Sequence, residues 1–459
     1  MTDLSVAAIE YAHRNRQRFL EELKEFIAIP SVSTDPGRDG DMLAAAEWVA
    51  ARLRALGFDH VRLYPTGGHP LVYGEYLKAG TEAKTVLVYG HYDVQPAEPL
   101  ELWHSGAFEP KVRGDNLYAR GASDMKGQVM AALAAVEAVM SAGQLPVNLK
   151  FLIEGEEEIG SPNLGQFIIA HKDLLACDFA INPDTGLLAE DLPTITYALR
   201  GLAYFELRVY GPSHDLHSGL YGGVVHNPAQ ALCELVAGMH DSDGRVTLPG
   251  FYHHVRSLDK EERDELSRLP TNEAFYMEQT GAPALWGEAG YTPVERIGAR
   301  PTLEVNGLFS GFTGEGSKTV LPAWAMAKIS CRLVPDQSPE EVYQQFQQYI
   351  AEKVPKTVRC EVIKLVGGPA SISDRHSKGV EAVAKAMETV WGKRPVFRRE
   401  GGSVPVVAEF QTHLGIETVN FGFGLPNDNA HGPDEKLHLP TWHRGIDAVV
   451  HSLYNISKE

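Results

Sequence analysis

The chain has 459 residues, of which 44% are hydrophobic and 22% charged, and its formal net charge at pH 7 is −18. This length exceeds the size at which a single core stops growing, so we expect two domains, and the composition excludes a disordered or fibrous chain. The acidic balance argues against binding to nucleic acid or to an anionic membrane surface.

The first part of the chain alternates helical and strand patterns. Residues 4–29 carry apolar side chains at helical spacing, and residues 41–56 predict a second helix. An Ala-rich helix is predicted over residues 126–142. Apolar runs predict buried strands at residues 84–89, 149–153 and 178–181. This alternation is typical of an α/β layer with a largely parallel sheet.

The pattern changes after residue 195. A long alternating strand is predicted over residues 204–210, and residues 325–334 and 357–366 predict two more strands. Between these two, Ser338-Pro339-Glu340-Glu341 is typical of a capping box with proline at the first helical position, followed by a helix over residues 342–353. These elements predict a small α+β unit with a sheet of its own.

Beyond Gly367-Gly368 the helix and strand rhythm of the first part returns, with a helix over residues 378–391 and a strand over residues 417–421. The predicted fold class is therefore α/β. A discontinuous α/β domain with a central, mostly parallel sheet is expected over residues 1–195 and 368–459, interrupted by a smaller α+β domain over residues 196–367.

The cysteines and the apolar runs bear on the compartment. No CxxC spacing of a zinc ribbon or redox motif occurs among the cysteines, so we expect free thiols at Cys177, Cys233, Cys331 and Cys360. No run of about 18 apolar residues occurs, and residues 1–32 lack the apolar core of a signal peptide. We therefore expect a cytoplasmic protein without a membrane span.

Histidines and carboxylates stand at the ends of predicted strands or at turns, where α/β proteins collect ligands. They are His91, Asp93, Asp124, Glu156-Glu157-Glu158, Asp184 and His431. Taken singly, each has an ordinary explanation: a histidine at a strand end, a helix-capping aspartate, a solvated acidic turn, an aspartate in an Asn-Pro turn and an exposed loop histidine.

Taken together, these residue types could form a metal site. Asp93, two positions after His91, can accept the second imidazole N–H and so leave the other nitrogen for a metal. Mixed histidine and carboxylate ligands suit Zn²⁺, Mn²⁺ or Co²⁺, and one carboxylate can bridge two ions about 3.5–4 Å apart. A free glutamate beside a ligand glutamate, as Glu157-Glu158 could supply, can take a proton from metal-activated water.

The ordered series GHYDVQP, RGASDMKG, EGEEEIGS, NPD and NAHGPDEKL resembles the M20 family of metallopeptidases, especially its carnosinase-like and Cys-Gly-type dipeptidases, over nearly the whole chain. The resemblance implies two divalent ions per subunit, Zn²⁺ or Mn²⁺ with Co²⁺ as an alternative. His91 and Asp184 would hold one ion, Glu158 and His431 the other, and Asp124 would bridge them.

The resemblance also implies the catalytic groups and the activity. Asp93 would orient the metal-binding histidine, and Glu157 would be the general base that later protonates the leaving amine, whereas Glu156 receives no role. The expected reaction is hydrolysis of dipeptides or short peptides. The alternative is deacylation of N-acyl amino acids or succinyl-diaminopimelate. A non-catalytic homologue should lack ligands or the base, and here all are present.

Four further positions resemble groups that bind substrate in this family. His226 in VHNP resembles a lid histidine that reaches the partner subunit's site, with Thr319 of KTVLP nearby, and this predicts a homodimer through the lid domain. Arg332 in CRLVP and Ser403 in EGGSVP resemble the groups that hold the terminal carboxylate, for which a guanidinium fork is suited. Val366 stands where eukaryotic dipeptidases of the family carry a histidine, which leaves the substrate preference open.

Overall fold

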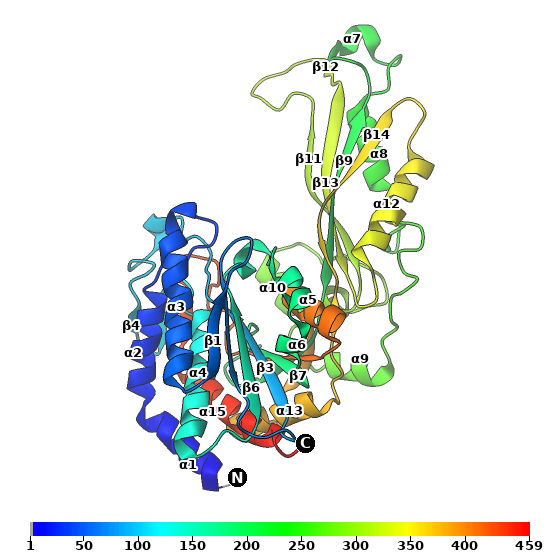
Figure 1. Cartoon of the computed structure of the whole chain (residues 1–459). Helices are drawn as coiled ribbons and strands as arrows, with labels where there is room; N and C mark the ends of the chain where they lie inside the picture. The colour runs from blue at the N-terminus through cyan, green and yellow to red at the C-terminus, as the bar shows by residue number, and fades with distance from the viewer. Residues whose placement is uncertain (1–2) are drawn as a thin grey trace. The chain divides into compact units, whose positions relative to one another are not determined.

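The computed structural model describes residues 3–459 and divides into two compact units (Figure 1). Unit 1 runs to Tyr197 and takes in Ser373–Phe397 and Pro405–Glu459, and unit 2 comprises Ala198–Ile372 and Arg398–Val404. Among residues 3–459, every helix is too short or too polar to cross a bilayer.

A nine-stranded mixed sheet contains the strands of unit 1, in the order β1-β2-β6-β3-β7-β17-β8-β15, with β16 paired to β8. The strands β6, β3, β7 and β17 are parallel neighbours at its centre, and their carboxyl ends therefore share one edge. The strand bounds are β1 Asp59–Tyr64, β2 Leu71–Tyr76, β3 Thr85–His91, β6 Asn148–Glu154, β7 Phe179–Asn182, β8 Thr194–Leu199, β15 Ser371–Ile372, β16 Val396–Glu400 and β17 Thr418–Asn420. The expected α/β fold class is confirmed.

Helices cover the sheet of unit 1 (Figure 1). The Ala-rich α4 is buried along most of its length, because it packs against β3 as well as α1, α2 and α15. The longer helices are α1 Asp3–Arg14, α2 Arg16–Ile27, α3 Asp39–Ala55, α4 Lys126–Ala142, α13 Lys378–Trp391 and α15 Leu439–Ile456. The shorter ones are η1 Pro36–Arg38, η2 Leu100–Leu102, η3 Glu157–Ile159, α5 Leu164–Ala170, α6 Lys172–Leu175, α14 Pro405–Glu409 and η4 Phe410–Leu414. A small sheet of β4 Lys111–Arg113, β5 Asn116–Tyr118 and β18 Lys436–His438 completes the unit.

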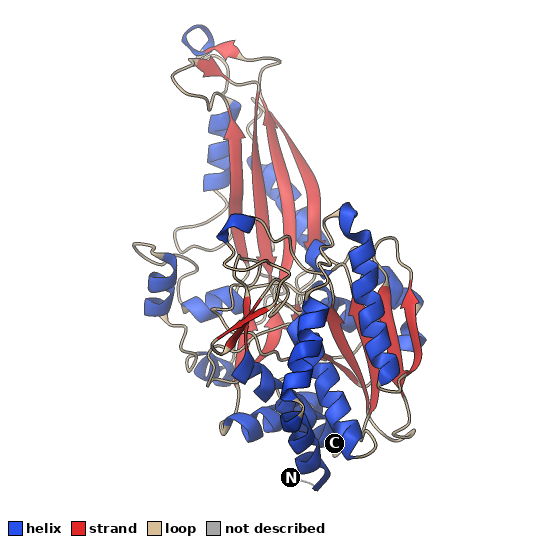
Figure 2. Ribbon diagram, turned by 90° about the vertical axis from the view of Figure 1, so that its left-hand side faces the viewer, coloured by secondary structure: helices blue, strands red, loops and turns tan. Residues whose placement is uncertain are grey.

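Unit 2 is built on a four-stranded antiparallel sheet in the order β11-β13-β9-β14, whose long strands are visible side by side in Figure 2. Alternate residues of β13 are buried, and α8 and α12 pack on the sheet. The strands are β9 Gly201–Tyr210, β10 Leu216–His217, β11 Thr302–Ser310, β12 Val320–Leu321, β13 Trp324–Leu333 and β14 Arg359–Gly368. The helices are α7 Ser218–Tyr221, α8 Pro228–Ala237, α9 Lys260–Leu266, α10 Glu273–Thr280, α11 Pro293–Gly298 and α12 Pro339–Lys353.

Three details differ from the sequence predictions. The helix predicted over residues 4–29 is broken at Asn15. The side-chain Nδ2 of Asn15 donates to the main-chain carbonyl of Tyr11 and so competes with the helical backbone for this acceptor. Ser338 caps α12 as predicted, but Glu341 does not return the bond, because its carboxylate lies against His254 and Gln345. Residues 398–404 belong to unit 2, although the sequence pattern assigned them to the other domain.

Candidate metal centre

His91 ends β3, and its imidazole is completely buried. Nδ1 donates to the main-chain carbonyl of Asp93 at 3.0 Å, and the Asp93 carboxylate lies 3.4 Å from the same nitrogen. The other ring nitrogen, Nε2, is buried and makes no hydrogen bond to any of residues 3–459, although Asp124 Oδ1 and Asp184 Oδ2 lie 3.2 and 3.8 Å away. A buried nitrogen that faces two carboxylates in this way is suited to binding a cation.

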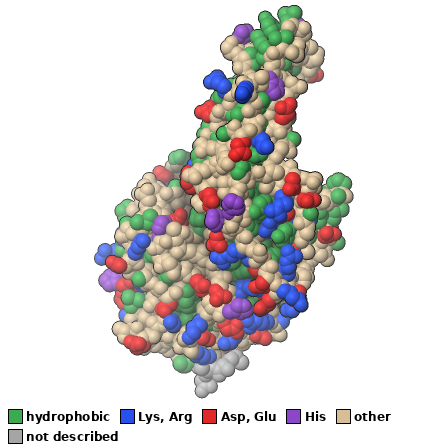
Figure 3. Space-filling model, turned by 90° about the vertical axis from the view of Figure 1, so that its right-hand side faces the viewer, with side chains coloured by type: hydrophobic (Ala, Val, Ile, Leu, Met, Phe, Trp, Pro, Cys, Tyr) green, Lys and Arg blue, Asp and Glu red, His purple; other side chains and the backbone are tan. Residues whose placement is uncertain are grey.

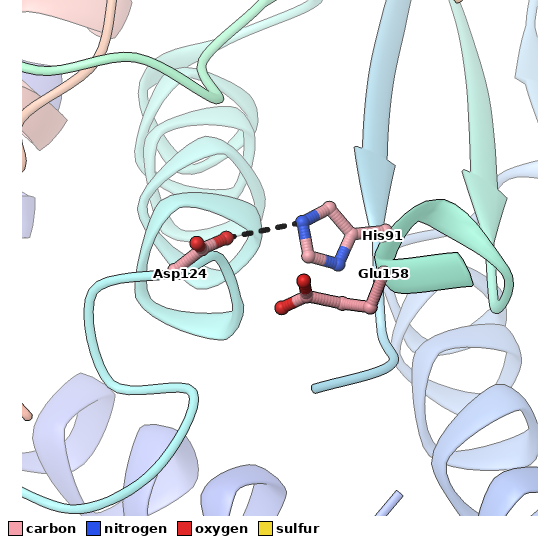
Figure 4. A group of neighbouring side chains, drawn as sticks. All are labelled: His91, Asp124 and Glu158. Atoms are coloured by element: carbon pink, nitrogen blue, oxygen red, sulfur yellow. Dashed lines mark ion pairs between the residues drawn. The ribbon is translucent and has the colours of Figure 1, made fainter. Parts of the chain in front are cut away.

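Asp124 stands two residues before the start of α4, and the N-cap of that helix is Met125. The Asp124 carboxylate instead faces two histidines: Oδ1 lies 3.2 Å from His91 Nε2, and Oδ2 lies 3.0 Å from His431 Nε2. Glu158 Oε2 lies 3.3 Å from the same His431 nitrogen. Figure 4 shows the Asp124 side chain pointing from the start of α4 towards His91, with the Glu158 carboxylate beside them. One carboxylate with a histidine on each oxygen is arranged to bridge two ions.

Glu157 and Glu158 follow β6 at the carboxyl edge of the parallel strands and begin the short helix η3. The main-chain N–H of Glu158 donates to Asp93 Oδ2 at 3.1 Å, which ties this turn to the strand-end segment of His91. Burial raises the pKa of the Glu157 carboxyl well above its usual range, and the charges of Asp184 and Glu158 raise it further against the opposing effect of His91. In the metal-free chain the Glu157 carboxyl therefore favours its protonated form more than a free carboxyl does.

The ligand atoms fall into two overlapping groups. One atom each from His91, Asp124 and Glu158 lies within 4.8 Å of the other two, and the same holds for His91, Glu157 and Asp184. All of these side chains come from the carboxyl ends of β3, β6 and β7 or from the start of α4. The structure thus brings together residues that are up to 93 positions apart in the sequence, counted from His91 to Asp184.

The charges of the centre show that a divalent cation fits it. Burial lowers the pKa of His91, but the nearby carboxylates of Asp124 and Asp93 outweigh this effect and raise it well above its ordinary value. Hydrogen bonds with Asp124 and Glu158 raise the pKa of His431 to about 10. In the metal-free chain, protons on these two imidazoles balance the carboxylates, and a metal ion supplies the same positive charge when it replaces them.

Glu435 supports the centre, and the sequence analysis gave it no role. Its fully buried carboxylate accepts hydrogen bonds from Arg120 Nη1 at 2.6 Å and from the main-chain N–H groups of Gly121, Ser123 and Asp124 at 2.9, 3.0 and 3.1 Å. It therefore fixes the loop that presents the Asp124 side chain. Both segments are conspicuous in the sequence, but only the fold shows that they meet.

Two other polar side chains hold the acidic turn. Gln95, in the segment GHYDVQP, donates to Glu158 Oε2 at 2.8 Å and was also missed. Glu156 accepts from Asn163 Nδ2 at 2.9 Å and from the main-chain N–H of His69 at 3.2 Å. Glu156 therefore connects its own turn to the segments of Asn163 and His69. This structural role explains a glutamate at a position without a predicted catalytic role.

The four predicted substrate residues all lie in unit 2. Arg332 and Ser403 come together, with Arg332 Nη1 donating to Ser403 Oγ at 3.0 Å. His226 precedes α8 and pairs through Nδ1 with Thr357 Oγ1 at 2.7 Å. Thr319 is exposed beside β12. Among residues 3–459, no hydrogen bond or ion pair joins His226 or Thr319 to the Arg332 and Ser403 pair.

Comparisons with known proteins agree with this geometry. Residues 87–455 match the peptidase family M20/M25/M40. The chain is 31% identical to the Cys-Gly metallodipeptidase DUG1 of Candida albicans, with 96% of this chain and 95% of that protein covered. It is 30% identical to the human Beta-Ala-His dipeptidase, with 94% of this chain and 88% of that protein covered.

A solved structure shares the whole architecture. It is that of an M20 family metallo-carboxypeptidase, Sso-CP2, from Sulfolobus solfataricus, which is 32% identical and superposes with a TM-score of 0.85 over 96% of this chain and 99% of that one. The match covers most of the chain, and the clustered histidine and carboxylate side chains fit a metal-dependent enzyme. The chain therefore belongs to peptidase family M20/M25/M40 and is an enzyme, a metal-dependent hydrolase of the metallopeptidase type.

Proposed function

We propose that this enzyme is a two-metal dipeptidase that hydrolyses the peptide bond of dipeptides or short peptides. The observation that carries the proposal is the Asp124 carboxylate, which faces His91 with one oxygen and His431 with the other. The proposed ligands are His91 and Asp184 for one ion, Glu158 and His431 for the second, and Asp124 for both. Their mixed nitrogen and oxygen atoms favour Zn²⁺ or Mn²⁺, with Co²⁺ as an alternative.

When bound, such ions lower the pKa of a coordinated water and polarise the scissile carbonyl. The protein supplies the proton transfers. The Glu157 carboxylate takes a proton from the attacking water and later gives it to the nitrogen of the leaving amine, so that one water is consumed for each amide bond broken. The raised pKa of Glu157 suits both transfers, because the group has to accept a proton and then release it. Asp93 keeps the ring of His91 in place.

Dipeptides are the proposed substrates because the similar proteins of Candida and human are named dipeptidases. The Arg332 and Ser403 pair supports this, since a guanidinium fixed by a hydroxyl is suited to a free terminal carboxylate. We further propose that His226 and Thr319 act in the partner subunit's site, where the histidine would polarise the scissile carbonyl.

Metal removal and a substrate panel test the proposal. Chelated enzyme should be inactive, and Mn²⁺ or Zn²⁺ should restore hydrolysis of free dipeptides such as Ala-Ala, measured by release of free amino acid. N-acetyl and N-succinyl amino acids and longer peptides serve as the comparison. Cleavage of only the acylated compounds would move the enzyme to the deacylase alternative, and removal of single residues from long peptides would make it a carboxypeptidase.

A homodimer through unit 2 is the second part of the proposal. Hydrophobic side chains gather at the end of unit 2 that carries α7 (Figure 3), where Leu220 and Val224 are 72% and 82% exposed. The strand β11 lies at the edge of its sheet and pairs only with β13. It carries further exposed apolar residues, Leu308 and Phe309. Exposed apolar groups of this kind mark association surfaces.

We expect size-exclusion chromatography with light scattering to give twice the mass of the monomer. Charged substitutions at Leu220 and Val224 should shift it towards the monomer and lower activity, because His226 and Thr319 would then lose their place in the partner's site. A monomer with full activity would contradict the dimer.

The cysteines support a cytoplasmic enzyme. Cys177, Cys233, Cys331 and Cys360 are all free. Free thiols without disulfides are usual in a reducing compartment. We therefore propose that the enzyme works in the cytoplasm on small peptides, without nucleic acid or a membrane as partner.

A further inference from the structure

Unit 2 contains a cavity of about 380 Å³ that Arg332 lines. Its lining holds an excess of cationic side chains, which is unusual in a chain with a net charge of −18. The charged lining residues are Arg200, Arg296, Arg300, Arg332, Glu288 and Glu304.

One of the two acids is already neutralised. Glu288 is buried and forms a bidentate pair with Arg300, with both contacts at 2.8 Å, and it also accepts from Arg245 Nη1 at 3.1 Å. Arg296 lies against the same residue but donates only to its main-chain carbonyl, at 2.9 Å. The Glu288 carboxylate is therefore already paired and does not neutralise the other arginines of the cavity.

Arg200 and Arg332, like Arg296, are left without an ion pair to a carboxylate. Neither has an Asp or Glu oxygen within 4.0 Å among residues 3–459, although the charge of Glu304, the remaining acid of the lining, acts on Arg200 from further away and opposes the lowering of its pKa. Ser403 connects the two, because its hydroxyl accepts from Arg332 Nη1 at 3.0 Å and donates to the main-chain carbonyl of Arg200 at 2.5 Å. The two guanidinium groups thus line one cavity, and Ser403 links the Arg332 guanidinium to the main chain of Arg200.

The Arg200 side chain makes one hydrogen bond and has a buried nitrogen without a partner. Its Nε donates to the carbonyl of Gly401 at 3.2 Å, and its Nη1 is buried without a hydrogen-bond partner. Burial and the charge of Arg332 lower the pKa of Arg200 to about 10, so it stays cationic at neutral pH. Gly401 makes room for it, since a Cβ there would lie 2.9 Å from Arg200 Nη2. A buried guanidinium N–H without an acceptor is costly, and an anionic ligand would relieve that cost.

We propose that this cavity receives the side chain of the substrate's C-terminal residue and that Arg200 makes the enzyme prefer dipeptides ending in aspartate or glutamate. The proposal rests on the proposed function, in which Arg332 and Ser403 hold the terminal carboxylate. A dipeptide of this class carries two neighbouring carboxylates, and three arginines of the cavity lining, Arg200, Arg296 and Arg332, form no ion pair with an Asp or Glu of residues 3–459. The cavity volume exceeds what a single carboxylate needs, which leaves room for a side chain.

The test compares Ala-Glu with Ala-Gln, which has the same shape without the charge. We expect the metal-loaded enzyme to favour Ala-Glu in kcat/KM by about tenfold or more, the order of magnitude for one charged hydrogen bond. Arg200→Met should remove the preference through a higher KM for Ala-Glu, while Arg200→Lys should keep part of it. Arg359→Met, at an exposed arginine on β14, is the matched control and should keep the wild-type ratio.

Calorimetric binding of free L-glutamate and L-glutamine to the full chain provides a readout that does not depend on catalysis. Glutamate should bind more tightly, and Arg200→Lys should weaken the difference. Equal cleavage of Ala-Glu and Ala-Gln together with equal binding of the two amino acids would overturn the inference while leaving a dipeptidase. The chain could instead bind glutamate selectively through Arg200 and cleave no dipeptide. That result would contradict the proposed function and support the assignment of the cavity.

Discussion

Replacing Glu157 by glutamine is expected to lower kcat for dipeptide hydrolysis by about 10²–10⁴-fold, the usual contribution of a general base. The amide has nearly the same size but cannot take a proton from water and return it to the leaving amine. The centre itself should survive, because the five proposed ligands are unchanged. Steady-state kinetics on Ala-Ala and elemental analysis of the dialysed protein measure the two effects separately.

The metal count decides between two roles for Glu157. Its carboxylate belongs to a group with His91 and Asp184 in which the ligand atoms lie within 4.8 Å of one another, so it is also close enough to be a ligand. If the glutamine variant loses a metal ion together with its activity, Glu157 is a ligand and the assignment as base is wrong. Glu156→Gln is the control, since Glu156 fastens Asn163 and His69 and should keep most of the wild-type kcat.

Local sequence patterns were sufficient for the elements with strong periodicity. The helices α4 and α13 have the bounds predicted for them, because an Ala-rich run and an amphipathic run each end at a glycine. The edge strand β1 escaped prediction, since all of its DHVRLY residues are at least partly exposed and give no buried run. The break at Asn15 was missed because the apolar spacing continues through it and only a side-chain hydrogen bond marks the interruption.

The residues of the candidate site could be predicted only in part. His91, Asp124, Asp184 and His431 could be named because several short motifs occurred in a particular order, although each motif alone had an ordinary explanation. Glu435 could not be assigned, since its function depends on a contact across more than 300 residues. The charge imbalance around Arg200 was likewise invisible, because whether an arginine has a carboxylate partner depends on packing and not on spacing.

Replacing Asp124 by asparagine is expected to remove both metal ions and almost all activity. Loss of a group that only supports a ligand typically weakens metal binding by about 10–100-fold, and a bridging ligand should exceed that range because it serves two ions. The asparagine keeps the shape and the main-chain bond to Glu435 but loses the negative charge that faces His91 and His431. Metal titration with a fluorescent competitor gives the affinity change.

A second readout of Asp124→Asn needs no metal and no activity. Hydrogen bonds with Asp124 and Glu158 raise the pKa of His431 to about 10 in the metal-free chain. Removing the Asp124 charge destabilises the imidazolium, so this pKa should fall towards the ordinary histidine value, and the ring should lose its proton at a lower pH. An NMR titration of the histidine ring signals measures the fall.

Asp434→Asn is the matched control, because Asp434 lies in the same loop as His431 but pairs with His104 and Arg113. It should leave both the metal count and the His431 titration unchanged. If Asp124→Asn binds two ions with wild-type affinity, the carboxylate that faces both histidines is not the bridge, and the two-metal arrangement proposed for this centre fails with it.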